Sequence, residues 1–378
     1  MKCIGKDVVS GSTIEVDFDQ SIRSVSATAG LAQSYLAPAW IDIQVNGYFG
    51  TDFNSPGTSH DQIARAIRYL HSTGVSRFYP TVITGGPEQM AGALANLARA
   101  KESLEEGPAM AGFHVEGPYI SPEDGPRGAH PRRWTRPPGL DEFLRFQDAA
   151  QGHVRLLTLS PEWPGAAGFI ERVVDTGVVV SLGHTKAEAP QIADAVAAGA
   201  TMSTHLGNGA HSTLRRHPNY IWDQLADDRL MASFIVDGIH LPQAFVKAAI
   251  RAKCVERSVL VTDASTPAEC PPGRYALGEQ EVDLTADGRV VLAGQNRLAG
   301  SALRMDRGIE NLQRLAGISL AGAVRMSTVN AALAGNVPGR KQGLVAGDLA
   351  DLVLFQVDPA TGRVAVEGTW LAGKRVYG

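Results

Sequence analysis

Short apolar runs recur along the middle of the chain, and stretches with helical spacing lie between them. Each run is rich in β-branched or large apolar residues and is followed by turn residues, as is typical of buried strands. The runs are Trp40–Val45, Arg77–Ile83, Met110–Val115, Val154–Leu159, Val178–Leu182, Ala200–Thr204, Met231–Val236 and Ser258–Val261. Eight such runs alternating with helices favour an α/β fold, a closed (β/α)8 barrel of the TIM type, over an open sheet.

The intervening stretches carry the helical signals. Asp61–His71 repeats apolar residues at helical spacing. Pro190–Ala198 is rich in alanine, has its proline near the start, and is followed by Gly199, which are typical helix boundaries. Helical patterns continue through Ser301–Leu315 and Leu320–Leu333. The order strand, helix, strand is therefore kept through most of the chain.

The two ends of the chain have a different pattern. Ser12–Phe18 alternates as a half-buried strand does, Gly343–Val357 gives a turn and a buried strand, and Val364–Val376 adds short β-like runs. We infer that both termini build one small β-sandwich domain beside the barrel. The expected segments are residues 1–37 and 336–378 in the small domain, and residues 38–335 in the barrel.

Composition narrows the class of protein. The 378 residues are 44% hydrophobic and 20% charged, which suits a globular chain with a large core. A net charge of −4 argues against nucleic acid or an anionic membrane as the main partner. Three cysteines without C-x-x-C spacing argue against a disulfide framework. The first residues lack the apolar core of a signal peptide, so we expect a cytoplasmic protein.

Polar residues gather where the predicted strands end. Because the carboxyl ends of parallel barrel strands meet at one rim, we expect these side chains to converge. A charged group there costs several kcal/mol unless it is paired or binds a metal. The residues are Gln44, Asn46, His114, Glu116, His184, His205, Asn208, Asp237, His240 and Asp263.

Glu116, His184 and His205 form the most informative subset. Two imidazoles and one carboxylate leave a position open for water, which is typical of a catalytic rather than a structural metal site. A divalent ion in such a site lowers the pKa of bound water to about 7 and polarises a carbonyl oxygen. The subset therefore indicates metal-assisted hydrolysis, for example of an amide.

Such a reaction also needs a group that moves protons. Asp263 is the favoured acid and base, because Asp42 lies inside the first strand and Asp237 is followed by a glycine turn. His130 and His240 remain as hydrogen-bond donors to the substrate carbonyl or hydroxyls.

Seven motifs, in order, resemble those of the N-acetylglucosamine-6-phosphate deacetylase family of the amidohydrolase superfamily. They are FHVEGPYISPE, RGAHP, GHTKA, THLGNGA, DGIHL, TDA and LAGSAL, and the resemblance runs from about Pro38 to the C-terminus. It implies a barrel with a small β domain, and hydrolysis of the acetamido group of an N-acetylated amino sugar. The expected substrate is N-acetylglucosamine 6-phosphate.

The resemblance also implies roles for residues. Glu116, His184 and His205 would hold the metal, Asp263 would be the acid and base, and His130 would polarise the acetyl carbonyl. Substrate contacts are implied for Ala129, His130, Asn208, Gly209, Asp237, His240, Leu298, Ala299 and Gly300.

The end of the first strand bears on the number of metals. Family members with two metals carry His-x-His there, whereas this chain has Gln44-Val45-Asn46. We therefore expect one divalent ion per subunit, with zinc expected and iron, manganese or cobalt also compatible with these ligands.

Arg216 lies eleven positions after His205, where the family carries an arginine that reaches the sugar phosphate across a dimer interface. The resemblance thus implies a homodimer. The surroundings depart from the family pattern, with Asn208-Gly209-Ala210 for Asn-Ala-Met and Arg216-His217-Pro218-Asn219 for Arg-Glu-Pro-Gly. Two alternatives stay open: hydrolysis of another N-acyl amine or an unphosphorylated N-acetyl sugar, and a barrel that only binds sugars.

Overall fold

A parallel barrel forms the body of the molecule. The structure, a computed structural model, describes residues 1–340 and 343–378. Within these residues, eight parallel strands follow the order β14-β13-β12-β11-β10-β9-β8-β5, and a bridge between Val45 and Ala264 joins the two edges. The strands are β5 (Trp40–Val45), β8 (Val75–Ile83), β9 (Phe113–Glu116), β10 (Val154–Leu159), β11 (Val179–Leu182), β12 (Met202–Ser203), β13 (Met231–Ile235) and β14 (Ser258–Val261). All eight predicted runs are confirmed as barrel strands.

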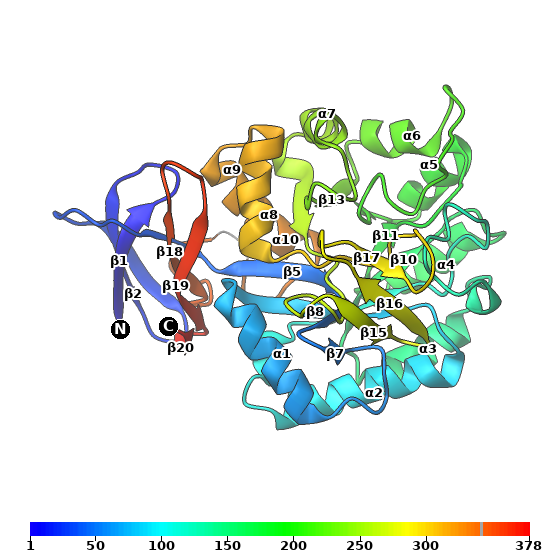
Figure 1. The fold of residues 1–378 in the computed structure, drawn as a ribbon, viewed down its shortest axis with the longest axis horizontal. Helices are drawn as coiled ribbons and strands as arrows, with labels where there is room; N and C mark the ends of the chain where they lie inside the picture. The colour runs from blue at the N-terminus through cyan, green and yellow to red at the C-terminus, as the bar shows by residue number, and fades with distance from the viewer. Residues whose placement is uncertain (341–342) are drawn as a thin grey trace.

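Helices surround the barrel (Figure 1). They are α1 (His60–Ser72), α2 (Pro87–Ser103), α3 (Leu140–Ala149), α4 (Ala166–Val174), α5 (Ala189–Ala197), α6 (Tyr220–Ala226), α7 (Gln243–Lys253), α8 (Met305–Asn311), α9 (Leu320–Met326) and α10 (Val329–Ala334). Short 3-10 turns are η1 (Gly107–Ala109), η2 (Arg132–Trp134) and η3 (Val255–Arg257), and η4 (Leu312–Ala316) is a π-turn. The predicted helices are confirmed, although the one expected from Ser301 begins at Met305.

Helix α1 shows why these segments are helical. Ser59 and Gln62 form a capping box that satisfies backbone donors at the start of the helix. Ile63, Ile67 and Leu70 then follow at helical spacing and are buried. Each such side chain contributes about 1.5–3 kcal/mol by leaving water.

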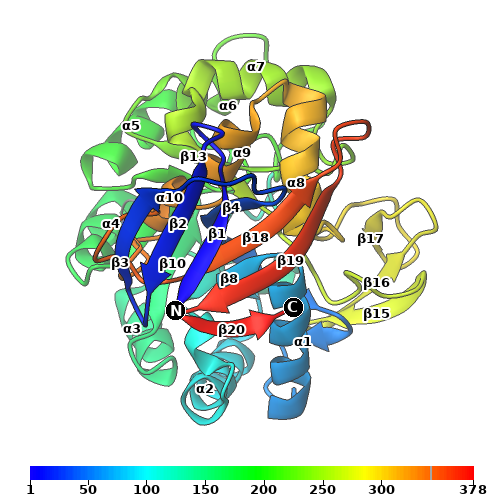
Figure 2. The ribbon, with the colours of Figure 1, turned by 90° about the vertical axis from the view of Figure 1, so that its left-hand side faces the viewer.

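Both chain ends contribute to a second sheet beside the barrel. In the described residues it has seven strands in the mixed order β20-β19-β18-β4-β1-β2-β3 (Figure 2). They are β1 (Lys2–Asp7), β2 (Thr13–Phe18), β3 (Ile22–Ala27), β4 (Tyr35–Pro38), β18 (Leu352–Val357), β19 (Val364–Leu371) and β20 (Lys374–Tyr377). The small β domain expected from both termini is confirmed, and its seven strands belong to one hydrogen-bonded sheet. The barrel and domain boundaries at 37/38 and 335/336 stay predictions.

A buried ion pair links the two units. Asp351, just before β18, contacts Arg77 of β8 at 2.5 Å and Arg340 at 2.8 Å. The Asp351 side chain is fully buried. Burial alone would raise its pKa, but the charges of Arg340 and Arg77 hold the pKa of Asp351 below its usual range.

An antiparallel insert follows the last barrel strand. It consists of β15 (Gly273–Leu277), β16 (Gln280–Leu284) and β17 (Val290–Leu292), between β14 and α8. A short hairpin, β6 (Gly47–Tyr48) with β7 (Thr51–Asp52), follows β5. The patterns along the chain did not lead us to expect a sheet in this position. Figure 2 shows the insert in yellow at the right-hand side of the barrel.

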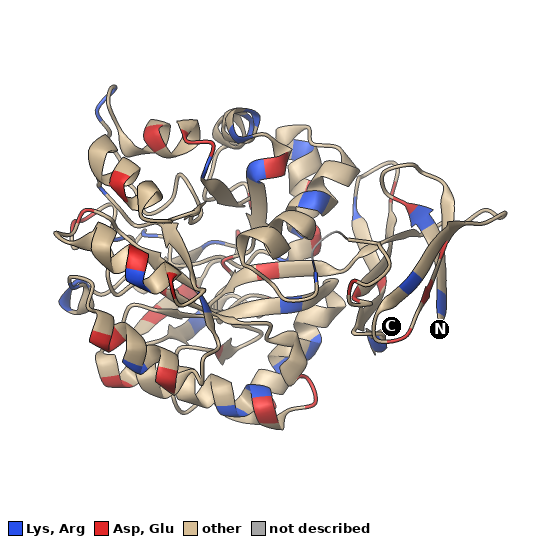
Figure 3. Cartoon of the chain, turned by 180° about the vertical axis from the view of Figure 1, so that it is seen from behind, with Lys and Arg blue, Asp and Glu red and all other residues tan. Residues whose placement is uncertain are grey.

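The surface carries charges of both signs. Figure 3 shows Lys and Arg interspersed with Asp and Glu along the helices of the face in view. None of the helices in the described residues combines the length and the apolarity needed to cross a bilayer.

Candidate metal centre and active site

A cavity of about 460 Å³ opens at the carboxyl ends of the barrel strands. Most of the residues predicted for the site line it. From the predicted set, the lining residues are Asn46, Glu116, Ala129, His130, His184, His205, Asn208, Gly209, His240, Asp263, Leu298, Ala299 and Gly300. The sequence thus located the cavity and most of its polar side chains.

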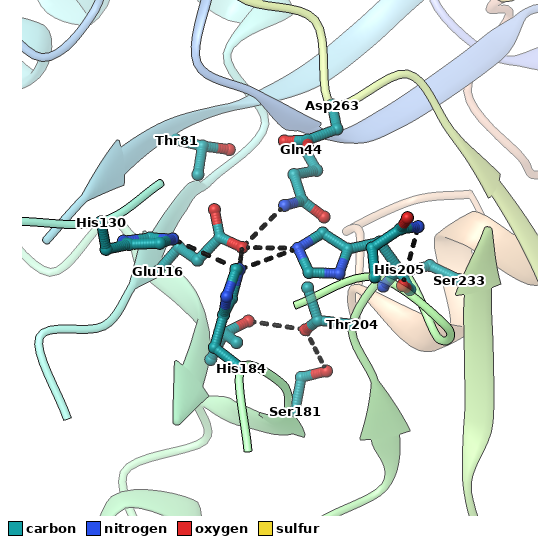
Figure 4. A network of polar contacts seen from close by, with 12 residues as sticks. Gln44, Thr81, Glu116, His130, Ser181, His184, Thr204, His205, Ser233 and Asp263 are labelled. Carbon is teal, nitrogen blue, oxygen red and sulfur yellow. Dashed lines mark hydrogen bonds and ion pairs between the residues drawn. The ribbon is translucent and has the colours of Figure 1, made fainter. Parts of the chain in front are cut away.

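Three potential ligand atoms converge at the base of this cavity (Figure 4). Glu116 ends β9, His184 follows β11 and His205 follows β12. Glu116 Oε1 lies 3.1 Å from His184 Nε2 and 2.9 Å from His205 Nε2, and the two Nε2 atoms are 3.1 Å apart. All three residues are buried.

The backbone is strained where these side chains enter the pocket. His184, His205 and Asp263 have φ values of 49°, 29° and 50°, in the left-handed region that side chains with a Cβ rarely adopt. Each such residue costs about 1–3 kcal/mol, and this kind of strain persists mainly at functional sites. The strain therefore marks the same three strand ends that the sequence singled out.

The protons on the imidazoles can be partly assigned. His184 Nδ1 lies 2.9 Å from the carbonyl oxygen of Pro126, so Nδ1 donates and Nε2 presents a lone pair to Glu116 and His205. Lone pairs this close repel unless a proton or a cation lies among them. This donor set fits a divalent metal ion, since one carboxylate and two imidazoles are typical ligands.

The charges of the three groups are coupled. Burial alone would raise the pKa of Glu116, but a proton on Nε2 of His184 or His205 forms a hydrogen bond to Glu116 that holds the pKa of Glu116 well below its usual range. Burial opposes protonation of His205, yet the hydrogen bond and charge of Glu116 raise the pKa of His205. Glu116 is therefore an anion, and it attracts positive charge into this corner of the cavity.

His130 is a fourth candidate ligand, and the third that offers a nitrogen atom. Its Nε2 lies 3.2 Å from His184 Nε2, and Glu116, His130 and His184 together could also hold a metal ion. His130 Nδ1 lies 2.9 Å from the Thr84 hydroxyl. Burial and the charge of His184 lower the pKa of His130 to about 3, so His130 is neutral at physiological pH.

Asp263 lies on the side of the cavity formed by β5 and β14. Asn46 Nδ2 donates to Asp263 Oδ1 at 2.7 Å, and the Asp263 amide donates to the Gln44 carbonyl at 3.0 Å. The preceding residue, Thr262, donates from its hydroxyl to Asp42 at 2.5 Å. Burial, with the charge of Glu116, raises the pKa of Asp263 to about 6. Asp42 is thus a buried support for this strand end and does not line the cavity.

Gln44 contacts the metal-site carboxylate from the first strand. Its Nε2 donates to Glu116 Oε1 at 3.1 Å, as Figure 4 shows. The side chain therefore presents an N–H group to Glu116. His114 also belongs to β9 but does not line the cavity. Its Nε2 is hydrogen-bonded to the Thr158 hydroxyl at 2.7 Å.

Two predicted substrate residues lie outside the cavity lining. Asp237 instead holds His240, whose Nδ1 is 2.6 Å from Asp237 Oδ2 and whose ring lines the cavity. Arg216 is exposed in the segment before α6. Within one chain, this arginine is not brought to the cavity.

The insert supplies lining residues that the sequence reasoning missed. They are Leu277, Gln280, Arg289, Asn296 and Arg297. The sequence did contain signals for these hairpins, because Gly278-Glu279 and Asp287-Gly288 are hairpin-type turns between alternating stretches.

Comparison with known proteins agrees with this geometry. Residues 35–376 match the profile described as Amidohydrolase family. N-acetylglucosamine-6-phosphate deacetylase of Bacillus subtilis (strain 168) is 33% identical over 330 residues, covering 86% of this chain and 82% of the relative. The Homo sapiens protein of that name is 34% identical over 352 residues, covering 90% and 83%.

A solved structure has the same overall fold as this chain. It is a mutant of N-acetyl-D-glucosamine-6-phosphate deacetylase from Mycobacterium smegmatis in complex with N-acetyl-D-glucosamine-6-phosphate. It superposes with a TM-score of 0.89 and 31% identity, covering 100% of this chain and 99% of that chain.

Proposed function

The chain belongs to the amidohydrolase family and, within it, to the N-acetylglucosamine-6-phosphate deacetylases, and from this premise we propose the reaction it catalyses. It hydrolyses the acetamido group of an N-acetylated amino sugar. The substrate is N-acetylglucosamine 6-phosphate, which gives glucosamine 6-phosphate and acetate. The proposal rests on the convergence of Glu116, His184 and His205 in the cavity that also contains the buried carboxyl of Asp263.

We assign one divalent metal ion, expected to be zinc, to Glu116, His184 and His205. This set is favoured over one with His130, because His205 is within 3.1 Å of both other ligand atoms. Gln44 supports a single ion, since it donates an N–H group to Glu116. When bound, the ion supplies Lewis-acid chemistry that activates water and polarises the acetyl carbonyl.

Asp263 moves the protons of the reaction. With a pKa of about 6, it is mostly ionised at neutral pH and can still carry a proton. It accepts a proton from the attacking water and returns it to the sugar nitrogen as the C–N bond breaks. Asn46 occupies Oδ1, while no hydrogen bond among the described residues occupies Oδ2.

The two remaining histidines orient the substrate. His130 is a neutral donor for the acetyl oxygen, because the Thr84 hydroxyl can donate to its Nδ1 and leave the proton on Nε2. The Asp237 carboxylate holds Nδ1 of His240 and leaves Nε2 for a sugar hydroxyl. Ala129, Asn208, Gly209, Leu298, Ala299 and Gly300 complete the contacts with the sugar.

We further propose a cytoplasmic homodimer. Arg216 is exposed and outside the cavity of its own chain, so Arg216 can contact the sugar phosphate only in the cavity of a second copy. A dimer in which Arg216 enters the partner's cavity would supply that contact.

The Asp263→Asn variant tests the chemistry. We expect acetate release from N-acetylglucosamine 6-phosphate to fall by about 10²–10⁴-fold while the bound metal per chain stays unchanged. The exposed Asp175→Asn variant, outside the cavity, should match the wild type in both measurements. Near-normal turnover of Asp263→Asn would rule out the role given to this carboxyl.

A further inference from the structure

Two arginines of the insert line the active-site cavity. Arg289 lies just before β17, and Arg297 lies between β17 and the Leu298–Gly300 segment. Among the described residues that line the cavity, these are the only lysine or arginine side chains. The reaction proposed above gives neither of them a role.

The Arg297 side chain lies close to the metal centre. Its Nη1 donates to the carbonyl oxygen of Gly128 at 3.1 Å. Gly128 in turn packs against His184, since a Cβ atom added to this glycine would lie 3.0 Å from His184 Cε1. A single residue therefore separates the Arg297 guanidinium from a proposed metal ligand.

Arg289 belongs to the same rim. Its Nη2 donates to the side-chain oxygen of Asn296 at 2.8 Å, and Asn296 precedes Arg297 in the chain. The two arginines thus flank β17, Arg289 before the strand and Arg297 in the segment that folds back along it. Each is oriented by a neutral carbonyl oxygen, so its positive charge is not neutralised by that contact.

Acidic groups near the two arginines are exposed or engaged elsewhere. Asp124 lies 3.7 Å from Arg297, but its side chain is 68% exposed and also pairs with Arg127. Asp287, near Arg289, accepts a hydrogen bond of 2.5 Å from the Thr285 hydroxyl. Arg289 forms no ion pair among the described residues, and the single ion pair of Arg297, with Asp124, is long and exposed to solvent. A guanidinium binds phosphate or carboxylate through two parallel N–H groups.

We propose that Arg289 and Arg297 form an anion subsite that binds the charged group of the amino-sugar substrate within a single chain. This inference rests on the proposed deacetylase function, and it adds a determinant of substrate selectivity supplied by the insert. The anion is a phosphate monoester on the sugar or a carboxylate substituent of an acidic N-acetyl sugar. Recognition of the anion then does not depend on Arg216 of a second copy alone.

Selectivity between substrates is the decisive readout. For the metal-loaded enzyme, kcat/KM is measured on N-acetylglucosamine 6-phosphate, N-acetylmuramic acid and uncharged N-acetylglucosamine. We expect Arg297→Gln and Arg289→Gln each to lower the ratio of charged to uncharged kcat/KM by about 10–100-fold, mainly through KM. The charged substrate whose ratio falls identifies the anion as phosphate or carboxylate.

A matched control comes from the same insert. Arg274 of β15 pairs with Asp283, is 54% exposed and does not line the cavity, so Arg274→Gln should keep the wild-type ratio. If Arg297→Gln and Arg289→Gln lower kcat/KM equally on all three substrates, both arginines only position the segment around Gly128, and the subsite is wrong. An unchanged ratio would equally contradict it.

Equilibrium binding separates this inference from the proposed reaction. Calorimetry compares glucosamine 6-phosphate with glucosamine on metal-loaded wild type, Arg297→Gln and Arg274→Gln, and needs no turnover. If the wild type releases no acetate but Arg297→Gln alone weakens binding of the phosphorylated sugar about 10-fold or more, the deacetylase assignment fails and the subsite stands. Equal affinities in all three proteins would overturn the subsite.

Discussion

Asn46 Nδ2 donates a buried hydrogen bond of 2.7 Å to Asp263 Oδ1. The contact crosses the seam at which β5 and β14 close the barrel, next to the bridge between Val45 and Ala264. It therefore links closure of the barrel to the position of the carboxyl that we propose as acid and base. The ionised form of Asp263 gains from this contact, because the amide N–H lowers its pKa.

Asn46→Ala should change the pH dependence of the reaction. Burial raises the pKa of Asp263 to about 6, and activity falls as the pH drops through the pKa because the base becomes protonated. A bound cation moves that pKa lower. Loss of the Asn46 hydrogen bond raises it, so we expect the acidic limb of kcat/KM to move up by about one pH unit. Asn96→Ala, in α2, should leave the limb in place. An unmoved limb in Asn46→Ala would contradict the proposed contact.

Paired substitutions at Glu116 and His130 distinguish the two possible ligand sets. Glu116→Ala should lower the metal bound per chain after dialysis, measured by elemental analysis, because it removes the anionic ligand. His130→Ala should keep the metal and lower kcat by about 10²-fold or more, since it removes a donor to the substrate carbonyl. Metal loss in His130→Ala would instead favour the set of Glu116, His130 and His184.

Gly209 tests how the chain positions His184. Gly209 has a φ of +54°, and an added Cβ would lie 2.5 Å from His184 Nδ1. Gly209→Ala should therefore displace the imidazole and weaken metal binding by about 10–100-fold, the range seen when support of a ligand is lost. Gly177 also has positive φ, at +83°, but nothing lies within 4 Å of an added Cβ. Gly177→Ala introduces the same kind of backbone strain without a contact to His184. Unchanged metal affinity in Gly177→Ala would therefore show that the loss in Gly209→Ala comes from the contact with His184. Equal effects would attribute the loss to strain.

Asp351→Asn should loosen the junction between barrel and small domain. It leaves Arg77 and Arg340 buried without their carboxylate, which costs about 3–5 kcal/mol in the free energy of unfolding. The lowered pKa of Asp351 stabilises the fold above the unfolded carboxyl value of about 3.9, and this contribution disappears as the pH falls through the lower folded pKa. Urea unfolding of wild type and variant at pH 7 and at acid pH measures both effects.

The control for this pair is Glu15→Gln. Glu15 pairs with Lys2 at the surface of the same small domain, so its loss should have little effect on unfolding. A similar midpoint for Asp351→Asn and Glu15→Gln would show that the buried pair adds no stability.

The barrel could be predicted because its strands are buried. The apolar runs lie mostly in the core, and Trp40–Val45 is buried at every position, so composition and turn residues were sufficient to locate them. The insert was missed because its strands are partly exposed and polar. Gly273–Leu277 has one fully buried residue, Leu277, and offers little hydrophobic contrast.

The site divides in the same way. Glu116, His184, His205 and Asp263 were predictable because a buried strand ends at each, and the barrel brings strand ends together. Arg289 and Arg297 could not be predicted as lining residues, because their position depends on how the insert folds back over the cavity. Asp237 was expected at the substrate but holds His240, a local contact within one turn that spacing alone does not reveal.

The most direct measurement of the central claim is acetate release by the metal-loaded protein. N-acetylglucosamine 6-phosphate and unphosphorylated N-acetylglucosamine are compared at equal concentration, with the chelator-treated protein alongside. We predict metal-dependent release of one acetate per amino sugar formed, with clear preference for the phosphorylated substrate. No release from either sugar, with one metal ion bound per chain, would contradict the assignment of this chain as an amino-sugar deacetylase.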